Sequence, residues 1–315
     1  MRIVALEEIR RAVRFPALID AMQEAVIAQS RGECETPMPM HLRTGGEDAE
    51  VHIKSSWRRG GKFWALKAAG SFPGRVAKGL PAGSGMILLC SVETGEPAAF
   101  FLDGGWMTDA RTAAVSAMAA RALGRRDTVI GVLGTGVQAR LQVLLHAEVL
   151  PLERAIVWGR SAERLEACRR DLESLAPGIA AEAAATPSDV AGRARLLVTA
   201  TAARGPLLEA RDLAPGTHVS AVGSDSPGKQ ELDPEILRRA ALLLVDSLSQ
   251  CERLGELQHA LSEKPRAIEL GRYCASPSVP APGSVTVCDF TGLGVEDLAI
   301  AELVYAALAP APPER

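Results

Sequence analysis

The sequence predicts an α/β protein with a Rossmann-type doubly wound parallel sheet and a second α/β domain whose sheet is rich in antiparallel strands. Three observations predict this fold class. The chain has 315 residues, more than one simple domain usually needs. Short β-like runs separated by Gly, Pro and charged turns occupy residues 34 to 103. From residue 129 onward, apolar runs alternate with helical segments.

The first residues have a helical pattern. Apolar side chains at three- and four-residue spacing run from 5 to 30 and are interrupted at Pro16, which predicts two helices. The runs EVHIKSSW, KFWALKAAG, GMILLCSV and PAAFFLDG follow, and their turns predict an antiparallel sheet. We expect an Ala-rich helix to begin near Thr108.

The second part of the chain is expected to form a parallel sheet. Helical segments separate its apolar runs, as in βαβ units. These runs lie at 129–133, 155–158, 196–199, 218–222 and 242–246. A last helix is expected in GVEDLAIAELVYAALA.

Composition narrows the class of partner. The chain has 35 Lys and Arg against 38 Asp and Glu, a formal charge of −3 that gives no reason to expect nucleic acid or an anionic membrane. The six cysteines and five histidines lack metal-ligand spacing. There is no apolar run of a signal peptide and none of the roughly 20 residues that a membrane helix needs. We expect a cytoplasmic protein with reduced thiols, a small-molecule partner and no metal site.

A glycine motif lies where the first apolar run meets a helix. The segment TVIGVLGTGVQAR contains Gly134, Gly136 and Ala139 at the spacing G-x-G-x-x-A. Gly134 permits a tight turn, Gly136 lets the backbone approach a pyrophosphate, and Ala139 allows close packing of helix on strand. The N-terminus of the following helix then stabilises the negative charge of the pyrophosphate. Such turns also occur as plain structure, but the strand, helix and following strand favour a dinucleotide site.

The end of the second strand indicates which dinucleotide binds. An NAD site usually has Asp or Glu there, to accept hydrogen bonds from the ribose 2′-hydroxyl. This chain has Gly159, Arg160 and Ser161. Arg160 can pair with a 2′-phosphate, so NADP(H) is preferred and NAD(H) is the alternative. In the simpler interpretation, Arg160 is only a solvated surface charge.

Several segments resemble the ornithine cyclodeaminase/mu-crystallin family. They are FWALKAAG, KGLPAGSGMILL, TGEPAAFFLDGGWMTDARTAAVSAMAAR, VLGTGVQAR, AVGSDSPGKQELDPEIL, GELQHAL and FTGLGVEDLAIAE, in the family's order. TDARTAA and GSDSPGKQELD are the specific ones. Within the family, HIK, DGGWMTDARTAA and GELQHAL are most similar to the ectoine-degradation branch, thought to act on 2,4-diaminobutyrate, and to imine-reducing members.

The resemblance implies a domain organisation. Residues 1–115 would bind substrate and dimerise, joined by a C-terminal helix at 295–315, and residues 116–294 would be an NAD(P)-binding Rossmann domain. The active site would lie in the cleft between them, in a homodimer. Beside Gly134 and Gly136, cofactor contacts are then expected from Arg111, Thr135, Val137, Gln138, Gly159, Arg160, Ser161, Thr199, Val222, Gly223, Ser224 and Lys229.

Three basic residues are candidates to bind a substrate carboxylate. Lys67 lies inside an apolar run, where a charge facing the core needs an anionic partner. It either points out of an edge strand or, as the resemblance implies, holds the carboxylate and assists proton transfer. Arg111 would offer two parallel hydrogen bonds to the same carboxylate, or is a helix-surface charge. Arg43 is the third candidate, and His41 competes for its position.

One acidic residue is a candidate for proton transfer. Asp225 follows an apolar strand, at the edge where open α/β sheets bind ligands. The resemblance implies that it contacts the substrate amine and moves a proton, and a turn-forming Asp is the alternative. Glu296 and Asp297 are expected to shape the site or cap the last helix.

These residues predict an NAD(P)H-dependent imine reductase or amino-acid dehydrogenase. Its substrate would be a small α-amino or imino acid, or a keto acid plus an amine, and the cofactor would carry the hydride. Two alternatives stay open: an ammonia-eliminating cyclodeaminase for an ornithine- or lysine-like substrate with recycled NAD, and a mu-crystallin-like ligand-binding protein. Gly159 argues against the first alternative, and Asp225 with the basic residues argues against the second.

Overall fold

The computed structural model describes residues 1–44 and 49–309, and the chain separates into two compact units. The first comprises Met1–Arg111 with Leu293–Arg315, and the second comprises Thr112–Gly292. The first border falls within helix α3 (Trp106–Ala122). The sequence-based borders lie after residues 115 and 294, and the expected helix 295–315 extends beyond the described residues. The roles assigned to the two domains stay predictions.

The first unit contains a mixed sheet in the order β1-β7-β6-β5-β4-β2, with β3 paired to β4. Its strands are β1 (Arg2–Ala5), β2 (Cys34–Glu35), β3 (Met40–Arg43), β4 (Glu50–Arg58), β5 (Phe63–Ser71), β6 (Gly83–Ser91) and β7 (Pro97–Leu102). β1 runs parallel to β7 and the other pairs are antiparallel. The four expected strands are therefore present, and β1, β2 and β3 are short additions that the sequence did not indicate.

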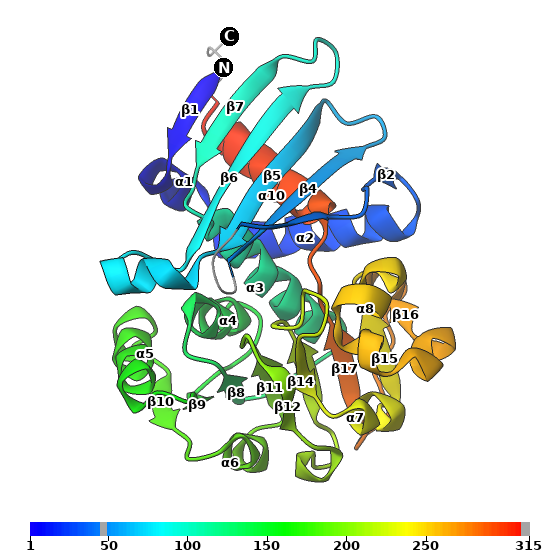
Figure 1. The fold of residues 1–315 in the computed structure, drawn as a ribbon. Helices are drawn as coiled ribbons and strands as arrows, with labels where there is room; N and C mark the ends of the chain where they lie inside the picture. Colours follow the sequence, from blue (N-terminus) through cyan, green and yellow to red (C-terminus); the bar gives the residue numbers. More distant parts are fainter. Residues whose placement is uncertain (45–48, 310–315) are drawn as a thin grey trace. The chain divides into compact units, whose positions relative to one another are not determined.

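Helices cover one face of this sheet. They are α1 (Leu6–Ala12), α2 (Phe15–Ser30) and α10 (Gly294–Ala307), and a 3-10 helix, η1 (Pro73–Lys78), lies between β5 and β6 in the chain. Pro16 lies in the first turn of α2, where its missing N–H costs nothing. α10 contacts α2, β4, β5 and β6, and Figure 1 shows it crossing behind these strands. The other face of the sheet carries no helix among the described residues.

The second unit contains a wholly parallel sheet in the order β10-β9-β8-β11-β13-β17-β15-β16. Its strands are β8 (Val129–Leu133), β9 (Arg154–Trp158), β10 (Ala180–Ala183), β11 (Leu196–Thr199), β13 (His218–Ala221), β15 (Leu242–Val245), β16 (Ile268–Glu269) and β17 (Thr286–Asp289). β12 (Arg204–Leu208) and β14 (Gln230–Leu232) pair separately. The five expected strands are all present, mostly as the continuous apolar runs typical of sheets buried on both faces.

The helices of this unit alternate with the strands. They are α4 (Val137–Ala147), α5 (Ala162–Leu175), α6 (Pro187–Arg193), α7 (Pro234–Arg239), α8 (Leu248–Leu254) and α9 (Leu270–Ala275), with 3-10 helices η2 (Ala210–Asp212), η3 (Glu256–His259) and η4 (Leu261–Arg266). From β8 the chain adds β9 and β10 on one side, and then crosses to β11 on the other. The carboxyl ends of β8 and β11 therefore mark the switch point where such sheets bind ligands. The predicted fold class is confirmed.

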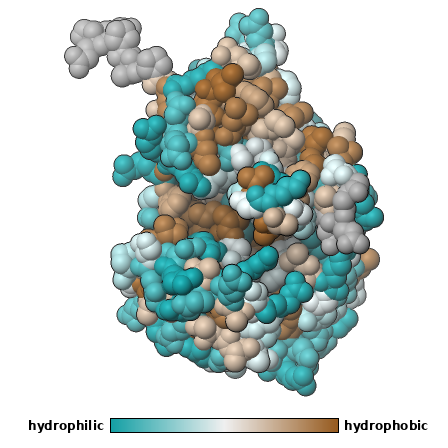
Figure 2. All heavy atoms as spheres, turned by 60° about the vertical axis from the view of Figure 1, so that its left-hand side comes forward, coloured by the Kyte–Doolittle hydropathy of each residue, from teal (hydrophilic) through white to brown (hydrophobic). Residues whose placement is uncertain are grey.

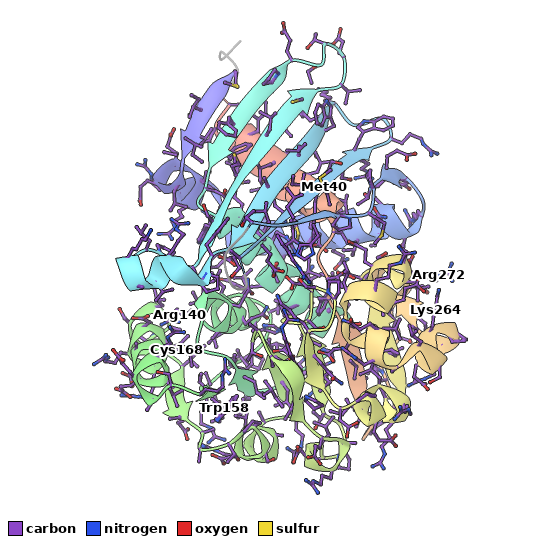
Figure 3. All side chains as sticks on the ribbon, in the orientation of Figure 1. Met40, Arg140, Trp158, Cys168, Lys264 and Arg272 are labelled. Carbon is purple, nitrogen blue, oxygen red and sulfur yellow. The ribbon has the colours of Figure 1, made fainter. Side chains whose placement is uncertain are left out.

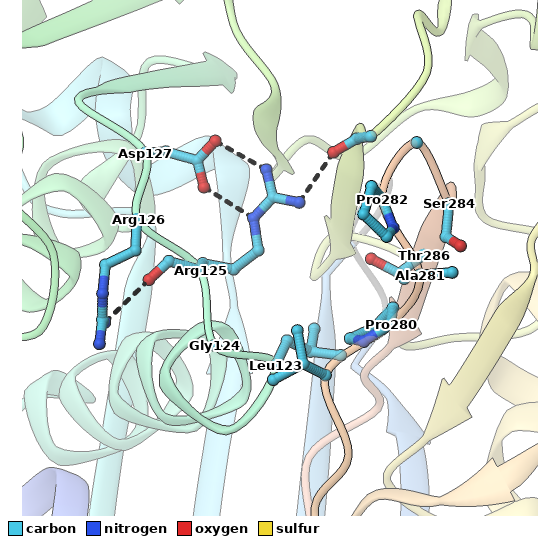
Figure 4. Close-up of a pocket in the computed structure, with 13 residues that line it drawn as sticks. Leu123, Gly124, Arg125, Arg126, Asp127, Pro280, Ala281, Pro282, Ser284 and Thr286 are labelled. Carbon is cyan, nitrogen blue, oxygen red and sulfur yellow. Dashed lines mark hydrogen bonds and ion pairs between the residues drawn. The ribbon is translucent and has the colours of Figure 1, made fainter.

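A cavity of about 320 Å³ lies at the opposite, amino-terminal edge of this sheet (Figure 4). Residues 123–127 and 279–284 line it, with Gly216 and Thr286. The Arg125 guanidinium is held there by Asp127 and by the carbonyl oxygen of Gly216, 2.8 Å from Nη1. These bonds connect the segment 123–127 to the turn before β13.

Two further observations concern the whole of the described chain. All six cysteines are free thiols, and five of them are buried. Among residues 1–44 and 49–309, no helix combines the length and the apolar character that crossing a bilayer requires.

Candidate active site

The glycine turn after β8 fits a dinucleotide phosphate. Gly134 has φ 134°, and a Cβ there would lie 2.4 Å from the carbonyl oxygen of Ala200, so only glycine makes this turn without strain. A Cβ on Gly136 would meet nothing within 4 Å, which leaves open space above the turn. No side chain caps α4, which begins at Val137. Its first N–H groups can therefore bind an anion.

Arg140 holds this turn, and the sequence did not indicate that role. Its Nη1 donates hydrogen bonds to the carbonyl oxygens of Thr135 (2.8 Å) and Gly136 (2.9 Å), and its Nε donates to Asp171 on α5. Figure 3 labels Arg140 on α4, on the side toward α5. Because both acceptors are main-chain atoms of the turn, Arg140 fixes the backbone to which a phosphate would bind.

The end of β9 leaves Arg160 exposed after Gly159. A Cβ at position 159 would lie 2.4 Å from Cγ2 of Thr135, so glycine there makes room for the first turn. Ser161 has a structural task, because its Oγ accepts a hydrogen bond from the Arg164 N–H and caps α5. The cofactor contact predicted for Ser161 stays a prediction.

Asp225 lies in the loop after β13, bonded to neighbours in the same loop. Its Oδ1 is 2.7 Å from Nζ of Lys229 and accepts a hydrogen bond from Ser226. Its side chain is 43% exposed, whereas that of Lys229 is 15% exposed. The Lys229 ammonium, predicted to contact the cofactor, is in this structure an ion-pair partner of Asp225.

Two buried carboxylates fix this loop and the one after β11. Glu231 accepts hydrogen bonds from the backbone N–H groups of Thr201 (2.6 Å) and Gly223 (2.9 Å). Glu256 in turn accepts from the N–H groups of Glu231 and Leu232. Burial raises the pKa of both carboxyl groups. The predicted cofactor residues Thr199, Val222, Gly223 and Ser224 lie on or next to the backbone that these groups hold.

Two more buried carboxylates continue the arrangement. Asp289 accepts hydrogen bonds from the N–H groups of Glu256 and Leu257, both 2.9 Å, and burial raises its pKa to about 7. Asp246 accepts from the N–H groups of Thr291 and Gly292. We call Glu231, Glu256, Asp289 and Asp246 the carboxylate ladder. The sequence signal for part of it was present in GKQELD and GELQHAL, but nothing there told a buried acceptor from a surface acid.

In the first unit, the strand register buries Lys67. A row of paired residues crosses four strands from Val4 to Phe101, Ile87 and Lys67. Lys54 on β4 lies directly opposite Lys67. Lys67 is 2% exposed on a strand with neighbours on both sides, so the edge-strand alternative does not apply.

Arg111 and Lys67 meet on one carboxylate. Lys67 Nζ lies 2.9 Å from Oδ2 of Asp297, and Arg111 Nε lies 3.0 Å from its Oδ1. Arg111 Nη1 also lies 2.9 Å from Glu296. All four side chains are buried, so Arg111 is not a helix-surface charge. The structure thus brings together two of the three residues predicted to bind a carboxylate, on the acids at the start of α10.

The start of α10 is placed by close backbone packing. A Cβ on Gly294 would lie 2.6 Å from the carbonyl oxygen of Ser55 on β4, so the helix approaches the strand as only glycine allows. Glu296 and Asp297 lie in the first turn, where the helix dipole stabilises negative charge. Both acids are thereby held over the row that ends in Lys67.

Burial is the main cause of the unusual acidity of Lys67. It lowers the pKa of Lys67 to about 7; the charges of Arg111 and Lys54 act in the same direction, while Asp297 opposes them. For Asp297, burial acts to raise the pKa, but the three cations together lower it. Burial therefore disfavours the charged form of Lys67, which an added anion would stabilise.

Arg43 lies further along the sheet. It is exposed and pairs in register with Glu50, four residues before Lys54, or about 13 Å along the strand. His41 bonds to Glu50, with Nε2 and Oε2 2.9 Å apart. The structure does not bring Arg43 to the Lys67 and Arg111 pair, and its substrate role stays a prediction.

The parallel sheet, the glycine turn and the switch point define a dinucleotide-binding α/β protein with a basic, carboxylate-bonded cluster in its other unit. Residues 2–310 match the ornithine cyclodeaminase/mu-crystallin family, and the chain belongs to this family. The predicted resemblance is confirmed. The narrower placement toward the ectoine-degradation branch stays a prediction.

Known proteins similar to this chain include reductases, dehydrogenases and a cyclodeaminase. The iminosuccinate reductase of Paracoccus denitrificans (strain Pd 1222) is 30% identical over 96% of this chain and 95% of its own length. The structure of an archaeal alanine dehydrogenase dimer with bound NAD is 29% identical, with a TM-score of 0.87 over 98% of this chain and 95% of that one. The structure of a lysine cyclodeaminase is 30% identical, with a TM-score of 0.87 over 98% of this chain and 92% of that one.

Proposed function

We propose that this protein is an NAD(P)H-dependent imine reductase or amino-acid dehydrogenase acting on a small α-amino or imino acid, or on a keto acid plus an amine. The observation that carries the proposal is the convergence of Lys67 and Arg111 on Asp297 inside the first unit. Two buried cations this close together can bind the carboxylate of a ligand, because a desolvated carboxylate needs charged partners. The iminosuccinate reductase and the alanine dehydrogenase among its relatives support the same reaction class.

The residues of the chain divide the work of the reaction. Lys67 and Arg111 bind and orient the α-carboxylate, exchanging part of their bonding to Asp297 for the substrate. Asp225, alone or through a water, moves the proton at the substrate nitrogen, and Lys229 holds Asp225 in place through their ion pair. The turn at Gly134 and Gly136, held by Arg140, binds the pyrophosphate. When bound, NAD(P)H supplies the hydride that passes to or from Cα.

The cofactor is proposed to be NADP(H) in preference to NAD(H). Gly159 offers no carboxylate to a ribose 2′-hydroxyl, and Arg160 next to it is an exposed guanidinium able to pair with a 2′-phosphate. The relative with bound NAD keeps NAD(H) as the alternative.

A substrate screen tests the proposed reaction. Purified protein is mixed with α-keto acids plus ammonia or amines, with cyclic imino acids and with α-amino acids, while NAD(P)H absorbance and ammonia are both followed. Net change of NAD(P)H with an imino or amino acid is the expected result. Ammonia and a cyclic product without net NAD(P)H change would instead identify the cyclodeaminase, which the lysine cyclodeaminase neighbour keeps as second candidate. Ligand binding with neither change would identify a binding protein.

We also propose a homodimer formed through the uncovered face of the first sheet. An in-register row of apolar residues crosses this face, from Ile3 to Phe100, Leu88 and Leu66. Ile3 is 60% and Leu66 36% exposed, and Figure 2 shows apolar side chains gathered over this part of the chain. Contiguous apolar surface of this kind usually marks an interface. The dimeric alanine dehydrogenase supports the same assembly.

Analytical ultracentrifugation tests this interface. The parent should sediment as a dimer, Leu66→Asp as a monomer, and Leu66→Met as the parent. Circular dichroism checks that both variants fold. A folded Leu66→Asp dimer would exclude this face.

A further inference from the structure

Two histidines and a glutamate meet on neighbouring strands of the first unit. His41 on β3 lies opposite His52 on β4, and Glu50 is two residues before His52 on the same strand face. Nε2 of His41 is 2.9 Å from Oε2 of Glu50, and Nε2 of His52 is 3.6 Å from Oε1. The three side chains are 25%, 15% and 16% exposed. Each imidazole therefore lies next to a different oxygen of the partly buried Glu50 carboxylate.

The two imidazoles pack against each other. Their ring centroids are 4.6 Å apart and their planes are inclined by 23°, so the rings are stacked. In their neutral forms both rings have a nitrogen lone pair. A divalent cation would satisfy these lone pairs and the carboxylate with one centre of charge.

The spacing of the three groups fits a small divalent cation. One ligand atom of each side chain lies within 4.8 Å of the other two. In a tetrahedral zinc site, with bonds of about 2.0–2.2 Å, neighbouring ligand atoms are about 3.3 Å apart. The separations of 2.9 and 3.6 Å lie on either side of this value. Small side-chain rotations would suffice to close the site.

We propose that His41, Glu50 and His52 form a binding site for a divalent transition-metal ion, with Zn²⁺ as the best match. Two imidazoles and one carboxylate are ligands that zinc favours, and three protein ligands leave a fourth position for water or another small ligand. The proposal departs from the expectation of no metal, which rested on spacing along the chain. His41 and His52 are 11 positions apart and meet only because β3 and β4 pair.

The location gives the site a connection to the candidate active site. Lys54 follows His52 by two residues on β4, so it shares the same strand face and lies opposite Lys67. A bound cation would thus lie about 7 Å along the strand from Lys54, and would add positive charge on that side of the basic cluster. The binding itself does not depend on the proposed reaction, so it can be tested without a substrate.

Zinc binding to the whole chain is the test. The protein is treated with a chelator, dialysed, and titrated with Zn²⁺ by calorimetry, with bound metal measured by mass spectrometry. We expect one Zn²⁺ per chain in the parent, and an affinity at least tenfold lower in His41→Ala and in His52→Ala, since losing even an outer partner of a metal site costs 10–100-fold. Glu50→Gln should weaken binding similarly. Glu35→Gln, an exposed glutamate of the same sheet, is the matched control and should bind as the parent does.

Two results would overturn the proposal. One is a parent that binds no zinc, and the other is unchanged affinity in His41→Ala and His52→Ala. X-ray absorption at the zinc edge of the loaded parent gives the same decision without any variant. It should show two imidazole ligands and no sulfur. Zinc held by sulfur would mean that it binds one or more of the six free thiols instead.

Discussion

The protonation state of Lys67 should control substrate binding, and exchanging Lys67 for arginine tests this. Burial, helped by the charges of Arg111 and Lys54, lowers the Lys67 pKa to about 7. Lys67 is therefore a cation below pH 7 and loses its charge above it. If the ammonium binds the substrate carboxylate, kcat/KM must fall as the pH rises through 7, because kcat/KM reports the ionisation of the free enzyme.

The size of the fall follows from this pKa. Two pH units above it, about one Lys67 side chain in a hundred keeps its proton. We expect kcat/KM at pH 9 to be about 100-fold below its value at pH 6, equivalent to about 3 kcal/mol. Lys67→Ala at pH 6, where Lys67 is charged, and Arg111→Ala at every pH should lower kcat/KM by about 2–5 kcal/mol, because the buried carboxylate loses a charged partner.

The assay is a pH series of steady-state rates, from pH 6 to 9 at constant ionic strength, with a substrate found in the screen. Lys67→Arg is the control, because a guanidinium stays charged over this range. Its kcat/KM should be lower overall but lack the fall that Lys67 causes. Titration of the substrate amine affects both proteins equally. A flat parent profile, or the same fall in Lys67→Arg, would refute the assignment.

Four other variants test the remaining assignments. Asp225→Asn should lower kcat by about 10²–10⁴-fold and leave the cofactor dissociation constant within twofold of the parent value. An unchanged kcat would mean that Asp225 only shapes the turn. In fluorescence titrations the parent should bind NADPH more tightly than NADH. Arg160→Ala should reduce this difference in binding free energy by about 1–3 kcal/mol, nearer the low end because Arg160 is exposed. Equal affinities of the parent for the two cofactors would contradict the assignment. Burial lowers the pKa of His146 to about 4, so the unfolded chain binds a proton at a higher pH than the folded protein does, and stability is lost as pH falls from 6.5 toward 4. Between pH 7 and pH 4, the free energy of unfolding in urea should therefore fall by about 3 kcal/mol less in His146→Gln than in the parent. An equal fall in both proteins would argue against a titrating His146. Gly255→Ala would place a Cβ 2.5 Å from a buried carboxylate and should cost about 1–3 kcal/mol in thermal unfolding, whereas the control Gly192→Ala has open space and should be neutral or slightly stabilising.

Periodicity and local chemistry predicted much of the fold. Short apolar runs bounded by turn residues, such as GMILLCSV and TVIGVL, predict buried strands, and the structure has β6 and β8 there. The turn at Gly134 was predicted from the spacing of Gly134, Gly136 and Ala139 between a strand and a helix, and its φ and its contact with Ala200 show why glycine is needed there. β2, with two residues, was not predictable, since its pairing with β4 depends on residues far along the chain.

The candidate site was predictable only in part. Lys67 was found because a charge within an apolar run needs a partner, but the partner Asp297 is 230 positions away and no local pattern points to it. Arg140 and Glu231 were missed for a different reason. Their hydrogen bonds go to main-chain atoms, which leave no mark on the sequence of the groups they hold.

The carboxylate ladder therefore limits which positions can vary. Glu231, Glu256, Asp289 and Asp246 accept hydrogen bonds from backbone N–H groups, and every residue except proline supplies such a donor. The hydrogen bond itself therefore does not fix the side chain of the donor residue. The acids are not free to change, because no neutral residue accepts two backbone donors with the same charge-assisted strength.

Two glycines share that restriction with the four acids. A Cβ on Gly223 would lie 2.6 Å from Oε2 of Glu231, and one on Gly255 would lie 2.5 Å from both carboxyl oxygens of Asp289. Evolution of new substrate preferences in this chain can therefore proceed through the loops around the sheet edge, residue by residue, while six fixed positions keep the backbone in place. An engineer who wishes to diversify these loops should leave the four acids and both glycines untouched and vary the other loop positions.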